Sequence, residues 1–67
     1  MTDREHFAAV AEVDYLMWEL GRMLKTERSL SAFDKMIDKV TGFDKVKLRD
    51  AKRMIKRVRK LQERLAD

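Results

Sequence analysis

The sequence predicts an all-α protein in which three helices form one small domain over residues 1–67. The chain contains no proline and only two glycines, and 42% of its residues are charged. Strong helix formers such as Ala, Leu, Met, Lys, Arg and Glu dominate it. Apolar residues recur at intervals of three and four, the spacing of one helix face. We expect helices over about residues 3–25, 30–40 and 44–66, arranged as a helical hairpin or a small three-helix bundle.

The first helix is predicted to begin after Thr2. Thr2 and Glu5 form a capping-box pattern, in which each side chain bonds a backbone amide of the first turn. Gly21 lies inside this helix, as a tolerated defect or a point of close packing. A broad apolar face should face the core, and it consists of Ala9, Val10, Val13, Leu16, Met17, Leu20, Met23 and Leu24.

The second helix is short and has clear signals at both ends. Ser29 and Ser31 are both candidate N-caps, because a serine oxygen can accept a bond from a free amide of the first turn. The helix should end near Val40, where Thr41 and Gly42 offer a left-handed stop.

The third helix is the most regular one. Asp44 can cap it, and Phe43 and Leu48 have the spacing of a hydrophobic staple. At about 100° per residue, one side is apolar and the other is basic. The apolar side consists of Leu48, Ala51, Met54, Ile55, Val58, Leu61 and Leu65. The basic side consists of Arg49, Lys52, Arg53, Lys56, Arg57, Arg59, Lys60 and Arg64, with Glu63 near its middle.

Charge is unevenly distributed along the chain. Residues 1–44 carry six Lys and Arg against nine Asp and Glu, whereas residues 45–67 carry ten against three. This asymmetry favours a polyanionic partner. So small a domain buries little surface, and without cysteine no disulfide can stabilise it, so we expect a homo-oligomer. The sequence shows no transmembrane segment and no secretory signal, and a cytoplasmic location is expected.

The basic side of the third helix has three possible explanations. It could be simply solvated, with Lys and Arg stems covering the core. It could pair with acids of the first helix, because Glu5, Glu12 and Glu19 recur every seven residues, as do Lys45, Lys52 and Arg59. It could bind a nucleic acid or an acidic protein surface, which we favour because like charges at helical spacing repel one another.

The first helix also has a second apolar face. Phe7, Ala11, Tyr15 and Trp18 follow one another at steps of three or four residues. Either the other two helices cover this aromatic patch, or it docks on a second copy of the chain or on another protein. We expect it to be an oligomer or partner interface.

The sequence offers little for catalysis. His6 is the single histidine, and there is no cysteine with which to build a nucleophile and base pair. Asp34, Asp38 and Asp44 lack the spacing of a calcium loop, and the alternating lysines favour a solvated surface. We expect no enzyme activity, no cofactor and no metal.

These features predict a small nucleic-acid-binding protein with a regulatory or architectural role, and duplex DNA is the expected ligand. Binding could follow a helix-turn-helix geometry, with the third helix in the major groove, or consist of contacts to the phosphate backbone. The basic side offers charge without the amides that read bases, which favours phosphate contact. The alternative is a helical protein-interaction module, acting as an adaptor, inhibitor or assembly factor.

Overall fold

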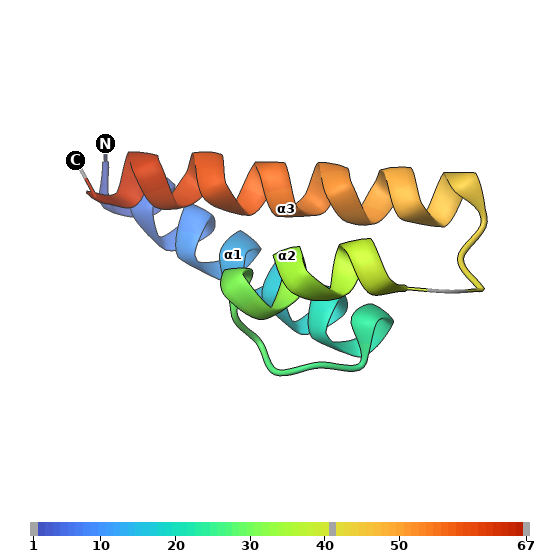
Figure 1. Cartoon of the computed structure of the whole chain (residues 1–67). Helices are drawn as coiled ribbons and strands as arrows, with labels where there is room; N and C mark the ends of the chain where they lie inside the picture. The colour runs from blue at the N-terminus through green and yellow to red at the C-terminus, as the bar shows by residue number, and fades with distance from the viewer. Residues whose placement is uncertain (1, 41, 67) are drawn as a thin grey trace.

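The computed structural model describes residues 2–40 and 42–66, which form three helices (Figure 1). They are α1 (Asp3–Leu24), α2 (Leu30–Lys39) and α3 (Lys45–Ala66). The predicted all-α fold is therefore confirmed, and each predicted helix boundary lies within one residue of the observed one. Both ends of the described chain lie at the same end of the bundle.

Each helix begins at a side-chain cap that the sequence predicts. The hydroxyl of Thr2 accepts a hydrogen bond from the amide three residues on, at 3.2 Å. Ser29 does the same for α2 at 3.1 Å, and the carboxylate of Asp44 does so for α3 at 2.7 Å. Of the two candidate serines, Ser29 is the cap, and Ser31 lies inside α2. These contacts satisfy amides that have no partner within the helix.

The end of α1 is a tight left-handed turn. Lys25 adopts φ 53° and ψ 49°, and its amide donates to the carbonyl of Gly21. A Cβ atom on Gly21 would lie 3.1 Å from Cγ of Arg28, closer than ordinary van der Waals contact. Gly21 is therefore a close-packing point, where the connection to α2 folds back against α1.

The end of α2 differs from the predicted stop. The helix ends at Lys39 because Val40 is already extended, with φ −64° and ψ 128°, and its half-buried side chain packs against the core. Thr41 lies outside the described residues. Gly42 does adopt a left-handed φ of 86°, but it does so in the connection beyond the helix end. The β-branched Val40 favours this extended backbone.

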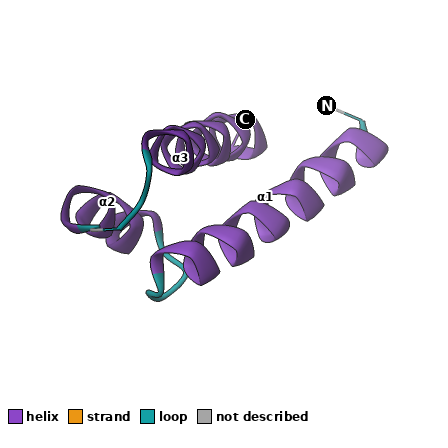
Figure 2. Cartoon of the chain, turned by 90° about the vertical axis from the view of Figure 1, so that its right-hand side faces the viewer, coloured by secondary structure: helices purple, strands orange, loops and turns teal. Residues whose placement is uncertain are grey.

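The core lies where the three helices meet. α1 packs mainly on α3 and runs in the opposite direction, while the short α2 packs beside both of them (Figures 1 and 2). The central cluster consists of Leu20, Leu24, Phe33, Ala51, Ile55 and Val58. Phe33 is the side chain that α2 buries completely. Leu61 of α3 and Ala9 of α1 extend the buried contact toward the chain ends.

One residue of the predicted core face of α1 is not part of the core. Val10 is 39% exposed, whereas its neighbour Ala9 is buried. Val10 lies at the border of the apolar face of α1, about 100° around the helix from Ala9. α3 therefore covers Ala9 and leaves Val10 largely open.

We predict that two identical substitutions in α3 will have very different effects. Val58 is fully buried, so Val58→Ala removes apolar contacts and leaves a cavity, and should lower the free energy of unfolding by about 2–3 kcal/mol. Val46 is 55% exposed on the same helix, and Val46→Ala should change it by less than about 0.5 kcal/mol. Urea unfolding followed by circular dichroism measures both. Equal losses would contradict the assignment of the core face.

Candidate nucleic-acid interface

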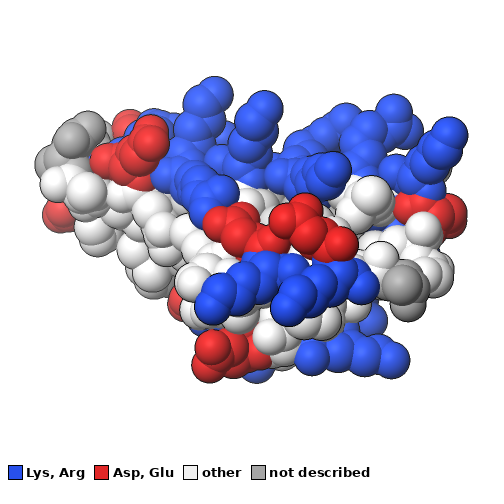
Figure 3. Space-filling view, in the orientation of Figure 1, with Lys and Arg blue, Asp and Glu red and all other residues white. Residues whose placement is uncertain are grey.

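All the predicted basic residues of α3 are exposed. They lie around the solvent-exposed side of α3, and Lys and Arg side chains project along that helix in the space-filling view (Figure 3). The set is Arg49, Lys52, Arg53, Lys56, Arg57, Arg59, Lys60 and Arg64. The clean partition occurs because Ala51, Ile55 and Val58 fill the opposite side of the helix.

At the edge of this surface next to α1, Arg57 forms a two-point ion pair with Glu12. Its Nε donates to Oε2 at 2.7 Å, and its Nη2 donates to Oε1 at 3.2 Å. The hydrogen bond from Arg57 holds the pKa of Glu12 below its ordinary value of 4.5. The same bond raises the pKa of Arg57. This bidentate geometry fixes the guanidinium in place.

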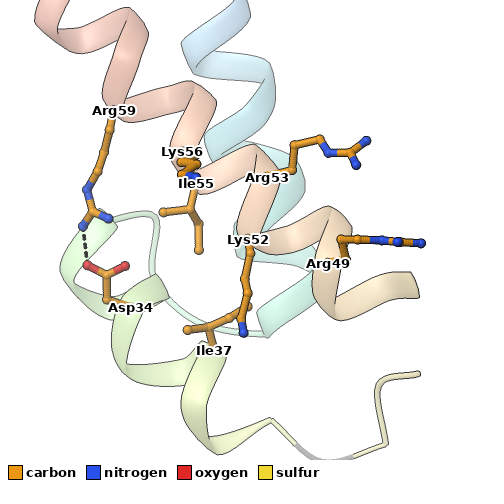
Figure 4. A pocket seen from close by; sticks show the side chains of 8 residues that line it. All are labelled: Asp34, Ile37, Arg49, Lys52, Arg53, Ile55, Lys56 and Arg59. Atoms are coloured by element: carbon orange, nitrogen blue, oxygen red, sulfur yellow. Dashed lines mark hydrogen bonds and ion pairs between the residues drawn. The ribbon is translucent and has the colours of Figure 1, made fainter. Parts of the chain in front are cut away.

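At the other edge, Arg59 pairs with Asp34 of α2. The two side chains reach toward each other across the groove between α2 and α3 (Figure 4). Both side chains remain about half exposed, so the ion pair adds little to the stability of the fold. Its main effect is to orient the Arg59 side chain toward α2.

The ladder of ion pairs that was one of the three explanations does not form between the first and third helices of one chain. Glu12 pairs with Arg57, and Glu19 pairs with Arg22 of its own helix. Arg59 turns to α2 instead of α1. The seven-residue repeat was misleading because the rotation of α3 places Arg57, and not Lys52 or Arg59, beside α1.

A central stripe of basic residues remains between these two edges. Among the described residues, none of the stripe's side chains takes part in an ion pair. The stripe consists of Arg49, Lys52, Arg53, Lys56, Lys60 and Arg64. From Arg49 to Arg64 it extends about 22 Å along the helix axis.

A shallow groove of about 470 Å³ adjoins the stripe between α2 and α3. Ile37 and Ile55 supply its apolar wall, and the stem of Lys52 leans toward Ile37 (Figure 4). Arg49 and Arg53 point away from α2. The pairing of Asp34 with Arg59 was not predicted from the sequence. No local pattern indicates it, because the two residues are 25 positions apart.

The arrangement of α2 and α3 does not favour a helix-turn-helix geometry. Asp34 near the start of α2 meets Arg59, and Ile37 in its second half shares the groove with Lys52. α2 therefore runs alongside α3 in the opposite direction (Figure 1). In a helix-turn-helix the two helices cross at a steep angle.

The aromatic patch of α1 is uncovered. Phe7 is 76% exposed, Tyr15 62% and Trp18 46%, and Ala11 between them is also exposed. The guanidinium carbon of Arg22 lies 5.9 Å from the centre of the Trp18 ring, within range of a cation–π contact. α2 and α3 both pack on the other side of α1, so the interpretation in which they cover the patch is wrong.

No protein-family model, curated protein or solved structure matches this chain. None of the described helices is apolar enough over a sufficient length to cross a lipid bilayer. The function is therefore argued from the stripe and the aromatic patch themselves.

The Glu12 to Arg57 ion pair predicts a pH-dependent contribution to stability. Because folding lowers the pKa of Glu12, the pair stabilises the protein fully above pH 4.5, and this contribution is lost as the pH falls through the lowered value. Thermal unfolding across pH 2–7 should show Glu12→Gln melting below the wild type at neutral pH, with the gap closing in acid. Glu27→Gln, in the exposed connection before α2, is the control. A gap that does not change with pH would contradict the assignment.

Proposed function

We propose that this protein binds the phosphate backbone of a nucleic acid duplex, with DNA as the expected ligand, through the central stripe of α3. It acts as a non-enzymatic protein in a regulatory or architectural role. The observation that carries the proposal is the separation of charges on α3: acids pair with the arginines at its two edges, and no acid among residues 2–40 and 42–66 pairs with the stripe between them.

The stripe destabilises α3 when no anion is bound, because its positive charges repel one another. Lys and Arg at intervals of three and four residues repel one another by a few tenths of a kcal/mol per pair. Lys52, Lys56 and Lys60 stand at such intervals along one line of the helix. A polyanion removes this repulsion and releases its own condensed counterions, which drives binding.

The composition of the stripe favours the backbone of a duplex over other nucleic acid features. It contains no aromatic side chain on which an unpaired base could stack. It also contains no Asn or Gln, the side chains that most often read adenine in the major groove. Arg can also read guanine, but a surface of Lys and Arg without Asn or Gln favours phosphate contacts, so we expect affinity with little sequence preference.

A second candidate function is that of a protein-interaction module. The uncovered aromatic patch favours it, because exposed Tyr and Trp are enriched at protein interfaces. In that case an acidic protein surface would be the ligand of the stripe. A single stoichiometric protein partner whose binding requires Trp18 would favour this function over the first.

We predict that the protein binds a labelled random-sequence DNA duplex with strong salt dependence. Contact of three to five phosphates by the stripe should give a slope of log affinity against log salt of about −3 to −5. Between 50 and 200 mM salt, the affinity should therefore fall on the order of 10²-fold to 10³-fold. Fluorescence anisotropy measures both. Absence of binding at 50 mM salt would overturn the proposal.

Two pairs of lysines provide a matched test of the site. Lys56→Gln with Lys60→Gln removes two charges from the stripe, and should weaken binding at least about tenfold and make the salt slope shallower by about 2. Lys35→Gln with Lys39→Gln removes the same charge from exposed positions of α2 and should have a much smaller effect. Equal effects of the two pairs would show that net charge, and not the stripe, determines binding.

A further inference from the structure

The uncovered face of α1 is diametrically opposite the core. Ala11 at its centre is nine residues from Leu20, which is fully buried, and nine residues correspond to half a turn beyond two full turns. We call this surface the outer face, and it consists of Arg4, Phe7, Ala11, Tyr15, Trp18 and Arg22. It combines large aromatic rings with arginines, the residue types enriched at protein interfaces.

The order of residues on the outer face is self-complementary. Phe7 and Tyr15 each stand four residues from Ala11, on opposite sides. Arg4 and Trp18 each stand seven residues from it, again on opposite sides. If a second copy of α1 lies antiparallel across Ala11, each Phe7 therefore meets the partner's Tyr15, and each Arg4 meets the partner's Trp18.

We propose that the occupant of the outer face is a second copy of this chain, bound through antiparallel pairing of the two α1 helices with Ala11 at the twofold axis. A twofold contact of this kind is the commonest arrangement in homo-oligomers. Alanine at the crossing point suits the geometry, because its small side chain lets the two helices approach closely while the flanking rings interdigitate.

The charges of the outer face are also matched in this arrangement. Arg4 would lie within reach of the partner's Trp18 ring, which the partner's own Arg22 also contacts, and one residue from the partner's Glu19, which is already paired with that Arg22. Arg22 would lie within about one helical turn of the partner's Asp3. A parallel pairing would instead place Arg4 against Arg4 and Arg22 against Arg22, so repulsion between like charges disfavours it.

The exposed aromatic side chains could supply more than half of the area that a small dimer interface buries. With about 200 Å² for each aromatic side chain, the exposed fractions leave roughly 350 Å² of ring surface per protomer. Two protomers would bury about 700 Å² of rings, and the arginine stems and alanines bring this toward the roughly 1,200 Å² of small specific interfaces. We expect a dimer with a dissociation constant on the order of micromolar.

The dimer leaves both central stripes open. Each stripe lies on α3, facing away from α1 and α2, while the dimer contact uses only the outer face of α1. Dimer formation and nucleic acid binding therefore use different residues. Each can fail in an experiment without the other.

The first test is the mass of the protein in solution. At about 100 μM, light scattering should give close to twice the chain mass of 8.0 kDa for the wild type. Trp18→Glu should give the mass of one chain with unchanged helicity, because Trp18 does not belong to the core cluster. Val46→Glu replaces an exposed apolar residue outside the outer face and should stay dimeric. A monomeric wild type, or a dimeric Trp18→Glu variant, would overturn the proposal.

The second test locates the twofold axis by disulfide cross-linking. Because the chain has no cysteine of its own, only the introduced cysteine can form a disulfide. In Ala11→Cys the two thiols would meet at the axis, and mild oxidation should link most of the protein. In Ala8→Cys, also exposed on α1, the two sites would be displaced by about 9 Å along the axis, too far for a disulfide. Equal cross-linking of both variants, as parallel helices would give, would overturn the antiparallel arrangement.

Discussion

The rest of the structure depends on the burial of one apolar contact, in which Ile55 and Val58 of α3 pack against Leu20 and Leu24 of α1 and against Phe33 of α2. These residues fix the rotation of α3 about its own axis. Since the apolar side of α3 must face inward, its basic side must face outward. The same contact fixes the rotation of α1, whose aromatic patch is turned away from the core. The packing of this one core therefore determines which way the basic side of α3 and the aromatic patch of α1 face.

The charged residues follow from that packing. Where α3 approaches its neighbours, Glu12 and Asp34 lie within reach of Arg57 and Arg59. Farther around the helix, none of the described acids of α1 or α2 forms an ion pair with a residue of the stripe. Exposed ion pairs contribute little to stability, so their main effect is to hold two arginines at the edges of the stripe. What remains is a band of basic side chains along one side of α3, with Glu63 as the acid within it, and the band still carries a net positive charge that suits a polyanion.

Much of the fold could be predicted from the sequence because it is local. Caps such as Ser29 and Asp44 bond amides three residues away, and the apolar period of α3 spans only neighbouring turns. The basic side of α3 and the grouping of the aromatic residues on one face of α1 follow from the same periodicity. Predictions failed where position depends on contact between helices. The exposure of Val10 depends on how far α3 covers the border of the apolar face of α1. The end of α2 agrees with the prediction to within one residue, although Val40, and not Gly42, ends the helix.

The sequence by itself determined three helices, their caps and the separation of apolar from basic residues, because each of these depends on spacing within one segment. Only the tertiary structure decided which acids meet which bases. The pairing of Arg57 with Glu12 joins residues 45 positions apart, and the rotation of α3 against α1 selects it over other acids and bases with the same repeat. Tertiary structure also decided that the aromatic patch stays uncovered, because the short α2 packs on the same side of α1 as α3 does, and no other described segment reaches the outer face.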